Sequence, residues 1–175
     1  MSPAPVWRRD RLLTISWDAM GRMLGALARD ITASGYAPTV VAGIARGGLP
    51  PAIALSNLLA VADFRILAIP RNTSNSRYSE RGEAVLDYVV PDRDMRGARV
   101  LLVDDIMGDG GTMALAVDTV RRLGAEEVRT AVVVRNLGAA RSADFTAVEV
   151  DDWTVFPWET PPGPGELSVP LPAPA

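Results

Sequence analysis

The stretch Val100-Leu-Leu-Val-Asp-Asp-Ile-Met-Gly-Asp-Gly-Gly-Thr-Met113 decides the fold. Four apolar residues are followed by two adjacent carboxylates, Asp104 and Asp105, and then by a glycine-rich turn that ends at Thr112. A short apolar run before such a turn predicts a buried strand, and the apolar helical pattern from Thr112 predicts a helix after it. We therefore expect this segment to bring two acids and an anion-binding loop to one edge of a sheet.

Strand and helix patterns alternate on both sides of this stretch. Apolar runs predict strands at 39–44, 64–69, 85–90, 99–103, 128–134 and 145–150, and helical spacing predicts helices at about 16–34, 50–59 and 112–123. This alternation predicts an α/β fold, with a mostly parallel twisted sheet flanked by helices. Residues 1–11 are expected to form a loose arm, in which Trp7 is a candidate anchor.

Composition excludes several classes of function. The chain has 175 residues, a length typical of one domain, and it contains neither cysteine nor histidine, which excludes thiol chemistry, imidazole bases and ordinary zinc sites. A net charge of −3 argues against a positively charged surface that would bind nucleic acid. The apolar runs are too short to cross a bilayer, and the N-terminus lacks the apolar core of a signal peptide. We expect a cytoplasmic protein whose partners include neither nucleic acid nor membrane.

The segment Asp104–Thr112 resembles the 5-phosphoribosyl-1-diphosphate signature of type I phosphoribosyltransferases. The resemblance implies that Asp104 and Asp105 bind the ribose hydroxyls directly or through Mg²⁺, the expected cofactor. It also implies that the following loop holds the 5′-phosphate. The expected substrate-binding residues of this segment are Asp104, Asp105, Ile106, Gly108, Asp109, Gly110, Gly111 and Thr112.

A second segment, Gly43-Ile-Ala-Arg-Gly-Gly-Leu49, resembles the pyrophosphate loop of the same family. Gly47 and Gly48 would let the backbone approach a diphosphate, and Arg46 would supply a fixed positive charge. The resemblance also implies a cis peptide in this loop, at Ala45–Arg46.

A third segment, Asp151-Asp-Trp-Thr-Val-Phe-Pro-Trp-Glu159, resembles the C-terminal hood of xanthine-guanine and other 6-oxopurine phosphoribosyltransferases. The resemblance implies that Trp153 stacks on the base. It also implies that Arg135 stands where relatives carry a lysine that reads the 6-oxo group. The expected organisation is a phosphoribosyltransferase domain over 1–159, with its small hood at about 135–159, and a flexible Pro/Gly-rich tail over 160–175.

The acid motif departs from the hood-bearing relatives at one position. They usually read Asp-Asp-x-x-Asp-Thr-Gly-x-Thr, in which the third aspartate is the proposed general base, whereas here Gly108 takes its place and Asp109 replaces the threonine. Either Asp109 has taken over the base role, or the enzyme uses no carboxylate there. Asp109, Asp105 and Arg46 are the candidate catalytic residues.

Together the three segments predict an enzyme that transfers 5-phosphoribose from phosphoribosyl diphosphate to a purine-like base and releases pyrophosphate. The base would be guanine, xanthine, hypoxanthine or a modified heterocycle, and a lid at 71–82 would exclude water. The resemblance implies a homo-oligomer, a dimer or tetramer. A regulator that binds phosphoribosyl diphosphate without turning it over is the alternative.

Overall fold

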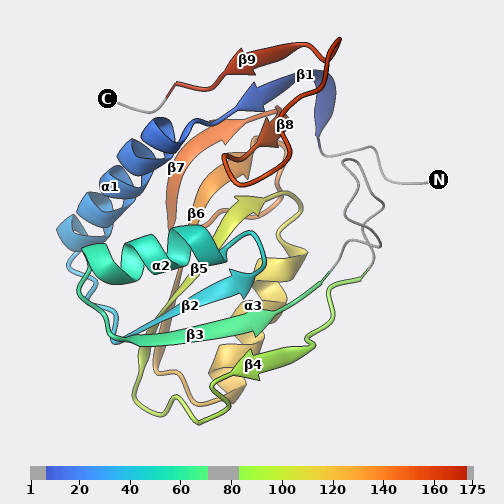
Figure 1. Cartoon of the computed structure of the whole chain (residues 1–175). Helices are drawn as coiled ribbons and strands as arrows, with labels where there is room; N and C mark the ends of the chain where they lie inside the picture. Colours follow the sequence, from blue (N-terminus) through green and yellow to red (C-terminus); the bar gives the residue numbers. More distant parts are fainter. Residues whose placement is uncertain (1–6, 71–82, 173–175) are drawn as a thin grey trace.

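A computed structural model of the chain describes residues 7–70 and 83–172, so the predicted lid at 71–82 lies outside the described residues (Figure 1). The described part is built on a six-stranded sheet. Its strands are, in spatial order, β4 (Tyr88–Val90), β3 (Asp63–Ala68), β2 (Val40–Ala45), β5 (Arg99–Met107), β6 (Glu127–Asn136) and β7 (Phe145–Val150). Neighbouring strands are parallel except for β4, which pairs antiparallel with β3, so the predicted mostly parallel α/β sheet is confirmed.

Helices cover both faces of this sheet. α1 (Trp17–Ala33) and α2 (Leu49–Leu58) lie on one face and α3 (Gly111–Arg122) lies on the other (Figure 1). The Ser16 hydroxyl caps α1 by accepting a hydrogen bond from the Ala19 amide at 3.1 Å, and Gly35 after its end has a φ of +77°, as the sequence pattern predicts. Each face of the sheet thereby buries its own apolar core.

β5 is longer than the sequence predicts, because it continues beyond Val103 to Met107. Its neighbour β6 continues beside it, and the two strands pair as far as Met107, opposite Arg135. The two acids are therefore the last part of a strand rather than the start of a loop. They are half-buried at the carboxyl edge of the sheet.

A second, three-stranded sheet, called the hood from here on, has the order β8 (Asp152–Val155), β1 (Arg8–Thr14) and β9 (Ser168–Pro170). Of the stretch 135–159 predicted as the hood, only β8 belongs to this sheet, because the end of β6 and all of β7 belong to the central one. Figure 1 shows it at the top of the molecule, near the ends of α1 and β7. The prediction of a loose arm is wrong for residues 8–11, because they belong to β1, which pairs with β8 and β9.

The predicted flexible tail also needs correction where the structure describes it. The Leu12 amide donates to the Leu167 carbonyl at 2.8 Å, the Leu171 amide donates to the Thr14 carbonyl at 2.8 Å, and Leu171 packs against the core. A Pro/Gly-rich composition argues against a core of its own, but an extended segment can still add a strand to the edge of an existing sheet.

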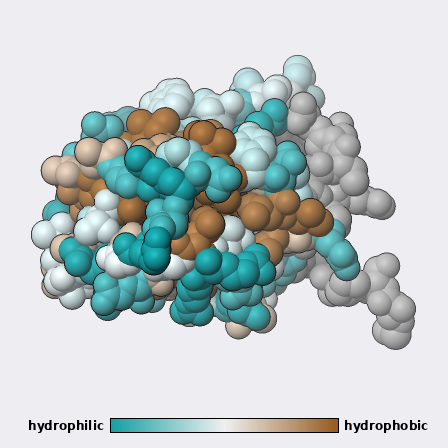
Figure 2. Space-filling view, turned by 90° about the horizontal axis from the view of Figure 1, so that it is seen from below, coloured by the Kyte–Doolittle hydropathy of each residue, from teal (hydrophilic) through white to brown (hydrophobic). Residues whose placement is uncertain are grey.

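The opposite end of the molecule carries exposed apolar side chains among hydrophilic ones. Figure 2 views this side from below, where β4 and α3 lie in Figure 1. Tyr88 and Val90 of β4 are half exposed there. Among the described helices, none combines the length and the hydropathy that a membrane crossing requires.

Candidate active site

A cleft of about 1220 Å³ lies between the carboxyl ends of β2 and β5 and the hood. In parallel α/β sheets this edge is where ligands bind, because loops and helix N-termini converge there. Most of the predicted site residues line the cleft: Arg46, Gly47, Asp104, Asp105, Ile106, Gly108, Asp109, Gly110, Thr112 and Trp153. Gly48 and Gly111 lie in the adjoining turns, and Arg135 lies elsewhere.

The turn between β2 and α2 lies directly against the two acids. The Ala45–Arg46 peptide is cis, as the resemblance implies, and Arg46 is exposed in the cleft wall. A Cβ at Gly47 would overlap the Asp105 carboxylate, and one at Gly48 would lie 2.6 Å from the Ile44 carbonyl oxygen and 2.7 Å from that of Val103. Only glycines allow this turn to lie so close to β5.

The surroundings of Asp104 and Asp105 orient one carboxylate and change the pKa of the other. The Asp105 amide donates to Oδ1 of Asp104 at 3.0 Å, which fixes the orientation of that carboxylate. Burial raises the pKa of Asp105 to about 6, hydrogen bonding with Asp104 opposes the rise, and the negative charge of Glu159 adds to it. A cation or sugar hydroxyls at this position would favour the charged form.

The donor set fits Mg²⁺ delivered together with a substrate. Asp104 and Asp105 offer hard carboxylate oxygens, yet within residues 7–70 and 83–172 no group of three or more His, Cys, Asp or Glu side chains could hold an ion by itself. Mg²⁺ is commonly held by one or two carboxylates, with phosphate oxygens and water completing its shell. Asp104 and Asp105 are therefore suited to a Mg²⁺ ion that the substrate phosphates also coordinate, rather than to an ion held by protein ligands alone.

The phosphate loop joins β5 to α3. Gly110 has a φ of +84°, a conformation suited to glycine, and α3 begins at Gly111, so its first amides face the loop. Oδ1 of Asp109 accepts a hydrogen bond from the Gly111 amide at 2.8 Å. The carboxylate therefore folds back onto the loop at the end of the helix where negative charge is favourable.

Arg135, the expected base reader, is not among the residues that line the cleft. Its guanidinium contacts Oε1 of Glu149 at 2.6 Å and donates to the carbonyl oxygens of Ala139 and Arg141 at 3.1 and 3.0 Å. These partners lie on β7 and on the connection between β6 and β7, so the donor fork of Arg135 is used in holding that connection in place.

The same connection brings Arg141 against the phosphate loop. A Cβ placed on Gly110 would lie 3.2 Å from Cβ of Arg141 and 3.3 Å from its Cδ. Sequence reasoning missed Arg141, because no motif surrounds it. Only the fold brings this cationic side chain next to Gly110.

The hood side of the cleft is aromatic. Trp153 is half-buried in the wall and meets Trp7 in an edge-on arrangement, with ring centroids 6.5 Å apart and an interplanar angle of 67°. Phe156 and Trp158 stack at 5.0 Å. Four tail residues that sequence reasoning did not include also line the cleft: Thr160, Pro161, Gly163 and Glu166.

A family model described as phosphoribosyl transferase domain matches residues 16–163. This chain belongs to that family. The predicted enzyme class, a phosphoribosyltransferase, is thereby confirmed.

Individual relatives agree with the family. An adenine phosphoribosyltransferase of Mycobacterium avium is 38% identical over 125 residues, which are 69% of this chain and 67% of the relative. The crystal structure of a purine phosphoribosyltransferase from Pyrococcus horikoshii superposes with a TM-score of 0.74 at 28% identity, over 87% of this chain and 97% of that one. A xanthine-guanine-hypoxanthine phosphoribosyltransferase of Helicobacter pylori shares the fold, with a TM-score of 0.69 at 14% identity, over 85% and 92% of the two chains. The predicted type I phosphoribosyltransferase fold is confirmed.

Proposed function

We propose that this phosphoribosyltransferase transfers 5-phosphoribose from phosphoribosyl diphosphate to a purine base and releases pyrophosphate. The observation that carries the proposal is the composition of the cleft. The Arg46 turn, the Asp104–Asp105 pair, the loop at 108–112 and the aromatic hood all line one space. A substrate with a diphosphate, a ribose and a 5′-phosphate has a complementary group for each of the first three, and a flat base suits the fourth.

The chemistry asks the protein for positioning and charge stabilisation. Arg46 would counter the negative charge of the departing diphosphate. Asp104 and Asp105 would hold the ribose hydroxyls, and the first amides of α3 would hold the 5′-phosphate. When bound, Mg²⁺ would neutralise diphosphate charge beside the two acids. Trp153 would hold the base against the anomeric carbon, and Asp109 is the candidate acceptor for its proton.

Two features of this chain support a base other than a 6-oxopurine. The chain contains no lysine, since all 18 basic residues are arginine, and Arg135 is engaged away from the cleft. The curated relative from Mycobacterium avium is an adenine phosphoribosyltransferase. We therefore place adenine first among the candidate bases, ahead of guanine, xanthine and hypoxanthine. The cytoplasmic location and the homo-oligomeric state stay predictions.

Pyrophosphate release tests the proposal. The protein is mixed with Mg²⁺, phosphoribosyl diphosphate and each of the four bases in turn, and we expect release with at least one of them. The Asp104→Asn/Asp105→Asn double variant is the control, expected to be inactive with an unchanged far-UV circular dichroism spectrum. Binding of phosphoribosyl diphosphate without release for any base would favour the regulator instead.

A further inference from the structure

One carboxylate in the cleft wall comes from the Pro/Gly-rich tail. Glu166 is the single charged residue of 160–175, where every other residue is Pro, Gly, Ala, Ser, Thr, Leu or Val. It lines the cleft together with Thr160, Pro161 and Gly163, and it is exposed there. The tail therefore contributes one acceptor of negative charge to the cleft and no cation.

The turn before β9 holds this carboxylate in place. The Gly163 amide donates to Oε2 of Glu166 at 2.6 Å, and the Glu166 amide donates to the Gly163 carbonyl at 3.2 Å. Gly165, which lies between them, has a φ of +91°, a conformation suited to glycine. An ionised carboxylate has two oxygens with about four lone-pair sites in all. The bond from Gly163 therefore orients the carboxylate of Glu166 without using up its capacity to accept.

Strand pairing brings this turn to the face of the hood that carries Trp153. Leu12 of β1 pairs with Trp153 of β8 and with Ser168 of β9, so the Cα atoms of Trp153 and Ser168 lie level and roughly 10 Å apart. Residues paired in register share a face of a sheet, and two positions along an extended chain share one as well, so Glu166 is expected on the face of Ser168. In agreement, Trp153 and Glu166 both line the cleft. A base stacked on Trp153 would therefore have the turn of Glu166 beyond its edge.

Electrostatics match Glu166 to the base and not to the phosphates. Among the described residues that line the cleft, Arg46 is the single cation beside five carboxylates, Glu166 included. The charge of Glu166 repels a diphosphate and a 5′-phosphate, so it gains nothing from that part of the substrate. A carboxylate only accepts hydrogen bonds, and the N–H groups of a neutral heterocycle are the donors that suit it.

We propose that Glu166 accepts a hydrogen bond from an exocyclic amine of the base and so selects aminopurines over purines without the amine. This inference rests on the proposed function. An exocyclic amine projects beyond the ring, so it is the donor that extends furthest from a base on Trp153 towards the turn. The polarity is the reverse of that expected of Arg135, because an arginine donates to a 6-oxo group whereas a carboxylate accepts from an amine.

Two pairs of bases that differ by a single amine test this proposal: adenine against purine, and guanine against hypoxanthine. We expect the wild type to show the lower KM for the amine-bearing member of the pair that it accepts. Glu166→Gln keeps an oxygen for the Gly163 amide but removes the charge. The KM of the amine-bearing base should then rise about tenfold, since hydrogen bonds to charged groups are the stronger ones. The KM of the amine-free base and that of phosphoribosyl diphosphate should hold or fall.

Glu126→Gln is the matched control. Glu126 is exposed on the connection between α3 and β6 and is not among the residues that line the cleft. The same loss of charge at this position should leave the KM of every base unchanged.

The outcomes separate the inference from the proposed function. A wild type that releases no pyrophosphate with any base overturns both. An active wild type without a preference for the amine, or with a preference that survives in Glu166→Gln, overturns the inference alone. Equal losses for both members of a pair in Glu166→Gln also overturn it, because they would show that the carboxylate only shapes the turn.

Discussion

At the scale of single residues, Gly47 leaves no room for a side chain next to the Asp105 carboxylate. A methyl group at position 47 would overlap this carboxylate, so Gly47→Ala must displace either the turn or the acid. We expect turnover to fall by roughly 10²-fold, the effect of a misplacement of about 1 Å, with little change in Tm. Steady-state kinetics and thermal unfolding check this.

A helical glycine offers the control for Gly47→Ala. Gly21 lies within α1, and a Cβ there would meet nothing within 4 Å. Gly21→Ala should leave turnover unchanged and stabilise the protein by about 0.5–1 kcal/mol. Full activity in Gly47→Ala would show that turnover does not depend on the position of the Asp105 carboxylate.

Asp109→Asn tests whether Asp109 acts as the general base in place of the aspartate that relatives carry at position 108, or whether no carboxylate has this role. Asparagine keeps a side-chain oxygen for the Gly111 amide, so the start of α3 should be preserved while basicity is lost. If Asp109 accepts the proton, turnover should fall by ~10²–10⁴-fold, and affinity for phosphoribosyl diphosphate should hold or improve. Unchanged turnover across the pH range would assign the carboxylate to the loop alone.

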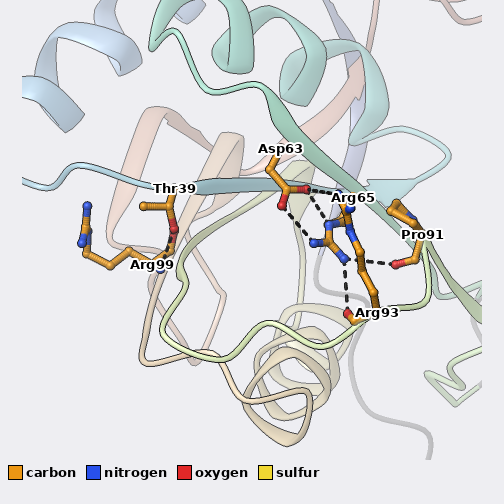
Figure 3. A network of polar contacts seen from close by, with 6 residues as sticks. All are labelled: Thr39, Asp63, Arg65, Pro91, Arg93 and Arg99. Atoms are coloured by element: carbon orange, nitrogen blue, oxygen red, sulfur yellow. Dashed lines mark hydrogen bonds and ion pairs between the residues drawn. The ribbon is translucent and has the colours of Figure 1, made fainter.

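At the scale of elements, a buried arginine ties β3 to the segment after β4. Arg65 is 3% exposed; its Nε and Nη2 donate to Asp63 at 2.7 and 2.9 Å, and its Nη1 donates to the carbonyls of Pro91 and Arg93 at 3.2 and 3.3 Å (Figure 3). Four donor contacts satisfy this cation, so the antiparallel edge strand and the turn behind it are held in place.

This pair should make stability depend on pH. Hydrogen bonds from Arg65 lower the pKa of Asp63 below its ordinary 3.8, so the stabilisation is present above that pH and is lost as the pH falls through the lowered value. Asp63→Asn should cost about 1–3 kcal/mol near neutral pH, and the difference from wild type should shrink below pH 3.8. Urea titrations over a pH series measure it.

Asp94→Asn is the corresponding control. Asp94 also pairs with an arginine, Arg96, but both side chains are exposed, and exposed ion pairs contribute little. A pH-independent difference between wild type and Asp63→Asn would show that the carboxylate charge does not matter.

The elements of the central sheet could be predicted from the sequence because local signals determine them. Ser16, Gly35 and the apolar spacing between them specify α1, and alternating strands and helices specify the parallel sheet. The end of β5 could not be predicted, since it depends on how far β6 continues beside it. β1 and β9 were missed for the same reason, because their partners lie across the hood.

At the scale of the whole molecule, both ends of the described chain build the hood. β1 lies between β8 and β9, and tail residues line the cleft. We therefore expect a chain ending at Glu159 to have a lower Tm and a raised KM for the base. A chain ending at Pro172, which keeps every described tail residue, should resemble the full chain in both assays. Wild-type kinetics from the shorter chain would contradict the role of β9.

Much of the candidate site could be predicted because its chemistry lies in contiguous segments. The turn at Arg46, the acid pair and the loop after it each combine residue types that suit phosphates or a cation within a few positions. Contributions that depend on packing between distant segments could not be predicted. Arg135 resembles a base reader in sequence, yet carbonyls of the following loop and Glu149 engage it, and that loop brings Arg141 to Gly110.

The hood also gathers the chain's tryptophans. All four tryptophans lie in or against it: Trp7 and Trp153 form one pair, and Trp158 meets Trp17, the first residue of α1, at 6.0 Å. Tryptophan emission will therefore report on the hood while remaining nearly silent about the central sheet. A base that quenches Trp153 can be titrated without a label. If the hood detaches before the core melts, emission and far-UV dichroism will show two transitions at different temperatures.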